Sequence, residues 1–104
     1  MTNKSNKIIE EIGQAAVLEQ CAEECAELAH ACLKMARKLR GENPTPKQYN
    51  ELKYAIREEI CDVELLLSML IDSLKISVHD MIDIMNAKES RWLDRIEEHK
   101  KQEE

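Results

Sequence analysis

The chain has 104 residues, of which 43% are apolar and 35% charged, and its formal net charge is −6. This length supports one hydrophobic core and is too short for two ordinary domains, so we expect a single domain over residues 1–104. Basic residues are interspersed with acidic ones, which argues against binding to duplex nucleic acid. Two Gly, two Pro and no Phe favour an all-α fold over a β-sandwich or barrel.

No segment of the sequence predicts a membrane span or a signal peptide. The N-terminal residues lead into an amphipathic stretch, and the densest apolar run, 63–74, is interrupted by polar residues such as Glu64 and Asp72. Cys21, Cys25 and Cys32 recur on one helical face among leucines and form no Cys-x-x-Cys knuckle, so we expect small, reduced core residues. A cytoplasmic location is therefore expected.

The first half of the chain predicts two helices. One starts near Ser5 and meets Gly13, where it bends or ends. The next spans 14–40, has cations in its last turns and ends at Gly41. Its apolar stripe has spacings of three, four and seven and consists of Leu18, Cys21, Cys25, Leu28, Cys32, Met35 and Leu39.

The second half predicts two more helices after a turn at 41–46. Thr45 as N-cap and Pro46 as the first helical residue would start the third helix, whose second half is apolar almost all round and therefore buried on most sides. Ser77 and Asp80 form a capping box for the last helix, which ends in a charged, frayed tail over 97–104. Its expected inward residues are Val78, Met81, Ile82, Met85, Trp92 and Ile96.

This much apolar surface is more than a chain of this size covers by itself. The nearly all-apolar stretch 63–71 indicates that a second copy packs against it. We therefore expect an antiparallel helical bundle completed by homo-oligomerisation, as a homodimer or homotetramer.

Two acidic pairs lie at mirror distances from the turn. In an antiparallel hairpin that bends near Asn43, Glu24 faces Asp62 and Glu27 faces Glu59, because the residue numbers of each facing pair have the same sum. Each pair is then roughly 24–29 Å from the bend at about 1.5 Å per residue. Four converging carboxylates repel one another unless a cation lies among them.

The chemistry of these residues favours Mg²⁺, with Mn²⁺ as a substitute. Ligands that offer only oxygen suit these ions better than zinc or copper, and Mg²⁺ commonly recruits substrate phosphates to complete its coordination. The expected substrate is therefore polyphosphorylated. Glu23 is turned about 100° from Glu24 on the helix, so it is either an outer-shell base or an exposed residue.

The motif Glu23-Glu24-Cys25-Ala26-Glu27, followed by Glu59-Ile60-Cys61-Asp62, resembles the signature of the MazG-like all-α nucleoside triphosphate pyrophosphohydrolases, a group that includes dimeric dUTPases and dCTP pyrophosphatases. The resemblance covers most of the chain, from the long helix through Trp92. It implies Mg²⁺ ligands at Glu24, Glu27, Glu59 and Asp62. It also implies hydrolysis of the α–β phosphate bond to a nucleoside monophosphate and pyrophosphate by dimers or tetramers of helical bundles.

The resemblance also suggests roles outside the metal ligands. Glu27 or Glu23 would accept the proton of the attacking water. Asn86, Lys88 and Arg91 are similar to family residues that contact phosphates. The alternative for Lys88 and Arg91 is that they are ordinary exposed charges on an amphipathic helix, and for Lys88 this alternative carries at least equal weight.

Gln20 has a binding interpretation, as a contact to a base or ribose, and a structural one, as a plain polar position. Three cations, Lys34, Arg37 and Lys53, are either attractors of a triphosphate or ordinary helix-terminal and surface charges.

Two alternatives lie outside this family. The unit Glu27-Leu28-Ala29-His30 is a Glu-x-x-His motif of the kind found in ferritin-like di-iron bundles, but a second such unit is missing from the sequence. A helical dimerisation or adaptor module explains the amphipathic stripes, but gives no reason for acidic residues on a largely apolar helix.

Overall fold

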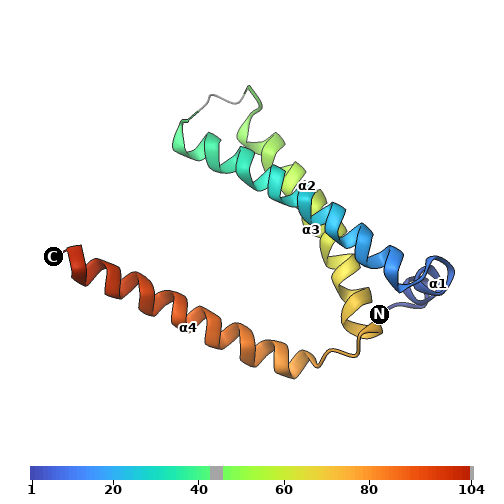
Figure 1. The fold of residues 1–104 in the computed structure, drawn as a ribbon. Helices are drawn as coiled ribbons and strands as arrows, with labels where there is room; N and C mark the ends of the chain where they lie inside the picture. Colours follow the sequence, from blue (N-terminus) through green and yellow to red (C-terminus); the bar gives the residue numbers. More distant parts are fainter. Residues whose placement is uncertain (43–45, 104) are drawn as a thin grey trace. The chain divides into compact units, whose positions relative to one another are not determined.

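The computed structural model describes residues 1–42 and 46–103, and within these ranges it contains four α-helices and no β-strand. The prediction of an all-α fold is confirmed for this part of the chain. The helices, coloured along the chain in Figure 1, are α1 (Asn3–Ile12), α2 (Gln14–Arg40), α3 (Tyr49–Ser73) and α4 (Val78–Glu103). They fall into two compact units, Met1–Ser73 and Leu74–Glu104. None of the four helices combines the length and hydropathy needed to cross a bilayer.

Capping residues explain where α1 and α2 begin and end. The Thr2 hydroxyl accepts a hydrogen bond from the Ser5 amide at 3.1 Å, so α1 begins two residues before the predicted Ser5. Gly13, with φ of 89°, ends α1, and its carbonyl accepts the first hydrogen bond of α2 from Val17. Gly41 adopts the left-handed conformation and ends α2, as predicted.

Helix α3 begins three residues later than predicted. Thr45, the expected N-cap, lies outside the described residues, and Pro46 is not helical. Gln48 takes the N-cap position instead, because its carbonyl accepts the first helical bond from the Leu52 amide at 3.2 Å. Its own amide donates to the Glu51 carboxylate at 3.5 Å, which satisfies a donor that would otherwise have no partner at the helix start.

Helix α4 starts as predicted but does not end early. The Ser77 hydroxyl accepts from the Asp80 amide at 3.2 Å, which confirms the cap. The helix then continues to Glu103 through the segment that the sequence predicts to be frayed. Within that segment His99 Nε2 lies 3.1 Å from Glu103 Oε1, one helical turn along. Such a pair supports the last turn of a helix built from residues with high helix propensity.

The core of the first unit lies where α1, α2 and α3 meet. Helices α2 and α3 run antiparallel and side by side (Figure 1), and Gln14 at the start of α2 donates to Ser73 at the end of α3 at 3.2 Å. The predicted hairpin is therefore present. Ile9 of α1 packs against its core, which consists of Val17, Cys21, Leu66, Met69 and Leu70.

The contact between α2 and α3 follows a regular seam of residues spaced alternately by four and three. On α2 it consists of Val17, Cys21, Glu24, Leu28, Ala31 and Met35, and on α3 of Leu52, Ile56, Glu59, Val63, Leu66 and Leu70, all buried or half-buried. The predicted stripe of α2 is correct only in part, because Leu18, Cys25 and Cys32 are exposed. The seam runs through Val17 and Glu24 instead, each about 100° from the predicted neighbour.

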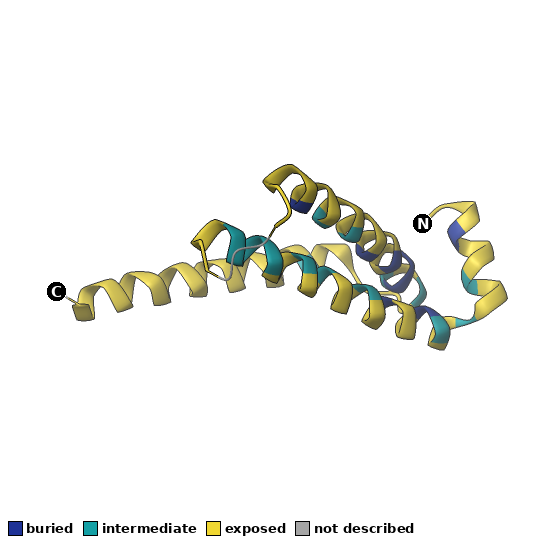
Figure 2. Cartoon of the chain, turned by 90° about the horizontal axis from the view of Figure 1, so that it is seen from above, coloured by how far each residue is buried: buried dark blue, intermediate teal, exposed yellow. Residues whose placement is uncertain are grey.

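Large apolar side chains outside the seam are uncovered. The expectation that α3 is buried on most sides is wrong for the single chain, since Leu65 and Leu67 are exposed and only one face of α3 meets α2 and α1. Helix α4 has no buried residue (Figure 2), so its six predicted inward residues are exposed or half-buried. All four cysteines are free thiols, as expected, but only Cys21 is in the core.

Candidate metal centre

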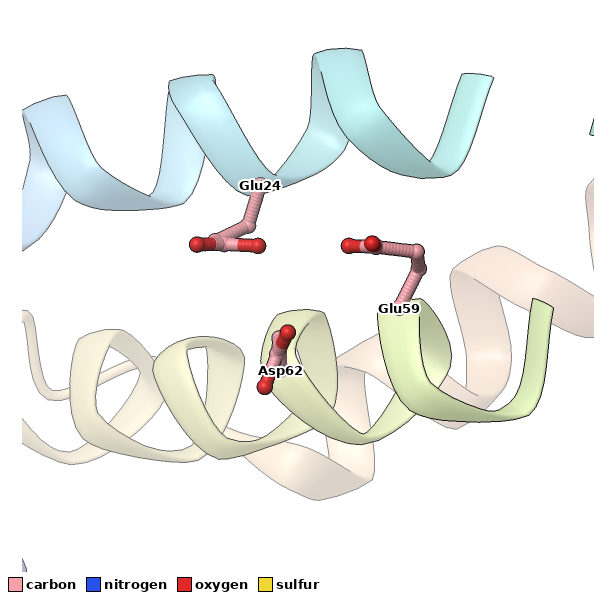
Figure 3. Close-up of side chains that lie close together, drawn as sticks. All are labelled: Glu24, Glu59 and Asp62. Carbon is pink, nitrogen blue, oxygen red and sulfur yellow. The ribbon is translucent and has the colours of Figure 1, made fainter. Parts of the chain in front are cut away.

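Three acidic side chains meet between α2 and α3. Glu24 projects from α2, and Glu59 and Asp62 project from α3, with the carboxylates of Glu24 and Glu59 directed at each other (Figure 3). Each residue offers one oxygen that lies within 4.8 Å of the oxygens offered by the other two. Glu24 and Glu59 occupy seam positions, where the neighbouring layers are apolar, and Asp62 is exposed at the edge.

Glu59 is the most constrained of the three. Its Oε2 atom is buried and has no hydrogen-bond partner among the described residues. Desolvation raises the pKa of Glu59 above its ordinary value, and the negative charges of Glu24, Asp62 and Glu27 and a hydrogen bond with Glu24 raise it further. A buried carboxylate oxygen that lacks a hydrogen-bond partner and lies close to other acids is unfavourable in the absence of a cation.

Gln20 orients one carboxylate of this group. Its Nε2 donates to Glu24 Oε1 at 3.0 Å, one turn along the same helix. Side chains that hydrogen-bond to a metal ligand fix the direction of its lone pairs. This positioning role of Gln20 was not predicted from the sequence, although its spacing of four residues from Glu24 is a signal for it. The expected contact of Gln20 with a substrate stays a prediction.

The other two acids of the first motif lie outside the three-residue group. Glu27 is exposed, yet it lines a groove together with Glu59, and its charge acts on the pKa of Glu59. Glu23 is exposed. Of the four predicted metal ligands, the structure therefore brings three together within the described chain. Glu27 is not part of this three-residue group, because the seam passes from Glu24 to Leu28 and Glu27 lies on the flank of the helix.

A groove adjoins the carboxylates on the side of the turn between α2 and α3. Its cavity measures about 120 Å³ and is lined by Glu27, His30, Ala31, Lys34, Lys47, Leu52, Ala55 and Glu59. Lys34 is half-buried, whereas Lys47 lies in the segment that precedes α3 and is exposed. Lys47 was not among the residues predicted from the sequence, because it precedes α3 and belongs to no helical pattern, yet it lines the same groove as Lys34.

The three predicted substrate ligands of the second unit lie on α4. Asn86, Lys88 and Arg91 are all exposed. Lys88 and Arg91 line a shallow surface hollow of about 310 Å³ with Trp92 and Arg95. Their role at the phosphates stays a prediction.

Comparisons with protein-family models, curated proteins and solved structures give no significant match to this chain. The resemblance to the MazG-like group therefore depends on the two acidic motifs of the sequence alone.

The donor set of the group fits a hard divalent cation. Three carboxylates supply only oxygen ligands, which Mg²⁺ and Mn²⁺ prefer, and an orphaned buried oxygen is what such an ion would satisfy. The group contains no histidine among the residues that the structure describes, although a di-iron centre of the ferritin type requires two. The identity of the ion, predicted as Mg²⁺ with Mn²⁺ as a substitute, stays a prediction.

Proposed function

We propose that this protein is a Mg²⁺-dependent nucleoside triphosphate pyrophosphohydrolase. The observation that carries the proposal is the buried Oε2 of Glu59, which has no hydrogen-bond partner among the described residues, on a side chain that groups with Glu24 and Asp62. The motifs that supply these three acids are those that resemble the MazG-like group. The alternative of a purely structural bundle gives no reason to retain two carboxylates at positions where the rest of the seam is apolar.

We assign metal binding, positioning of a ligand and proton transfer to different residues. Glu24, Glu59 and Asp62 would hold Mg²⁺, which when bound offsets phosphate charge and lowers the pKa of a coordinated water. Gln20 keeps Glu24 in position. Glu27 is the better candidate for accepting the proton of the attacking water, because it lines the groove beside Glu59, whereas Glu23 does not.

The exposed apolar faces support a homo-oligomer as the working form. Ile60 and Leu67 lie seven residues apart on one face of α3 and are both exposed. Helix α4 has a second uncovered stripe, which includes Ile82, Met85 and Trp92. Apolar surface of this extent is typical of interfaces. A second candidate function, a helical adaptor without catalysis, is favoured by the same stripes but leaves the carboxylate group unexplained.

The test is pyrophosphate release from a panel of ribo- and deoxyribonucleoside triphosphates, with Mg²⁺, with Mn²⁺ and with EDTA. Wild type should release pyrophosphate only with metal, and Glu59→Gln should lose at least about a hundredfold in rate, as expected when electrostatic stabilisation of a transition state is removed. Glu58→Gln is the matched control, since Glu58 is the exposed neighbour of Glu59 and pairs with Arg57 at 3.1 Å.

Stability measurements separate the enzyme from the adaptor. A metal that binds only the folded state raises the melting temperature, so wild type and Glu58→Gln should melt higher with Mg²⁺ than with EDTA. Glu59→Gln should show little of this difference. The adaptor would be favoured if no nucleotide is hydrolysed and the melting temperature of wild type is the same with Mg²⁺ as with EDTA.

A further inference from the structure

The groove beside the carboxylates has two ends of opposite charge. Glu27 and Glu59 line it at the carboxylate group, and Lys34 and Lys47 line it together with His30. Neither lysine forms an ion pair within residues 1–42 and 46–103. Two ammonium groups near a cavity, without a protein counter-ion, are suited to hold an anion of the ligand.

The size and walls of the groove restrict that anion. The cavity of about 120 Å³ accepts a small group rather than a whole nucleotide, and Leu52, Ala31 and Ala55 supply apolar walls between the charged ends. Leu52 is buried, which fixes one wall. Lys34 is half-buried on α2 and lines the cavity, as suits a lysine whose aliphatic stem packs while its ammonium group stays accessible to a ligand.

We propose that this groove binds the β- and γ-phosphates of the substrate, with Lys34 and Lys47 as their cationic partners. The proposal rests on the proposed pyrophosphohydrolase function and names the part of the substrate that the groove holds. Binding of the β- and γ-phosphates in the groove also orients the substrate, because the scissile α–β bond then lies at the end of the groove where Glu59 meets Glu24.

The reaction balances with these roles. The oxygen of a water forms a bond to the α-phosphorus, and the bond between this phosphorus and the bridging oxygen breaks. The bridging oxygen leaves with the electron pair as part of pyrophosphate, while Glu27 takes the proton of the water. Lys34 and Lys47 stabilise the charge that develops on the leaving group, which is where fixed cations contribute most to the rate.

Direct binding of pyrophosphate tests the assignment without turnover. Isothermal titration calorimetry with Mg²⁺ and inorganic pyrophosphate should show roughly tenfold or greater weakening in Lys34→Met, since hydrogen bonds between charged groups are worth this much. Lys34→Arg keeps the charge and should restore most of the affinity. Lys53→Met is the matched control, because Lys53 is an exposed lysine of α3 that does not line the groove.

Kinetics distinguish the failure of this assignment from the failure of the proposed function. If the assignment is correct, Lys34→Met raises KM for the triphosphate and the inhibition constant of pyrophosphate together, and leaves inhibition by the nucleoside monophosphate unchanged. Wild type that hydrolyses triphosphates, with an unaltered pyrophosphate affinity in Lys34→Met, would overturn the groove assignment alone. No hydrolysis by wild type, with or without Mg²⁺, would overturn the function and this assignment with it.

Discussion

Replacing one exposed leucine on α3 should weaken self-association without unfolding the chain. Leu67 is 43% exposed, while Met69, two residues along the same helix, is 2% exposed. We expect Leu67→Gln to leave the fold intact, because Gln has nearly the same helix propensity as Leu and the side chain lies outside the core. The change removes apolar surface only from the face that we assign to the partner subunit.

The size of the effect follows from the exposed fraction. Full burial of a leucine side chain is worth about 1.5–3 kcal/mol, so the exposed 43% of Leu67 corresponds to about 0.6–1.3 kcal/mol. A two-fold symmetric dimer buries this face twice, which gives about 1.3–2.6 kcal/mol. The dissociation constant should therefore rise roughly 8- to 70-fold.

Sedimentation equilibrium over a range of concentrations measures this constant for wild type and variant. Urea unfolding at protein concentrations below the dissociation constant of the dimer checks that the monomer has kept its stability. A wild type that remains monomeric at high concentration, or a Leu67→Gln variant that associates as tightly as wild type, would show that this face of α3 is not an interface. A loss of monomer stability of more than about 1 kcal/mol would contradict the expectation that the fold stays intact, since surface substitutions rarely cost that much.

Two further predictions concern the protein in the absence of metal. In EDTA, lowering the pH from neutrality through the raised pKa of Glu59 should stabilise the fold, because the folded state then binds more protons than the unfolded state. Thermal unfolding of wild type should show this rise relative to Glu59→Gln, and parallel pH profiles for the two proteins would contradict it. In the core, Met69→Ala should cost about 2–5 kcal/mol in urea unfolding, and a loss below about 1 kcal/mol would place Met69 outside the folding core.

Much of the helical architecture could be predicted from the sequence because its signals are local. Gly41 ends α2 and Ser77 caps α4, each through a backbone requirement that one or two residues satisfy. The start of α3 was misplaced because Pro46 satisfies the rule for a first helical residue just as Gln48 and Glu51 satisfy the cap. When local rules of equal strength apply at nearby positions, they do not determine which residue begins the helix.

The face of each helix that is buried was harder to predict than the helix itself. Val17 and Leu18 are adjacent residues of α2 and both are apolar, so the sequence does not distinguish them. Only the packing against α3 determines that Val17 lies in the core. The stripes on α3 and α4 satisfy the periodicity of buried helices, yet they are uncovered in the single chain. A periodic apolar pattern predicts that one face of a helix is buried, but it does not predict whether the element that covers this face belongs to the same chain.

The carboxylate site shows the same division between pattern and packing. The mirror spacing of the acidic pairs predicted Glu24 opposite Asp62 and Glu27 opposite Glu59, and the structure brings Glu24 close to Asp62 but also close to Glu59. Glu27 lines a groove together with Glu59, its predicted partner, but lies on the flank of the seam, which advances alternately by three and four residues; its role as a metal ligand stays a prediction. The two glutamates that occupy seam positions replace apolar side chains and bring one uncompensated oxygen into the interior. A cost to folding at these positions is expected where binding, and not stability, determines the residue.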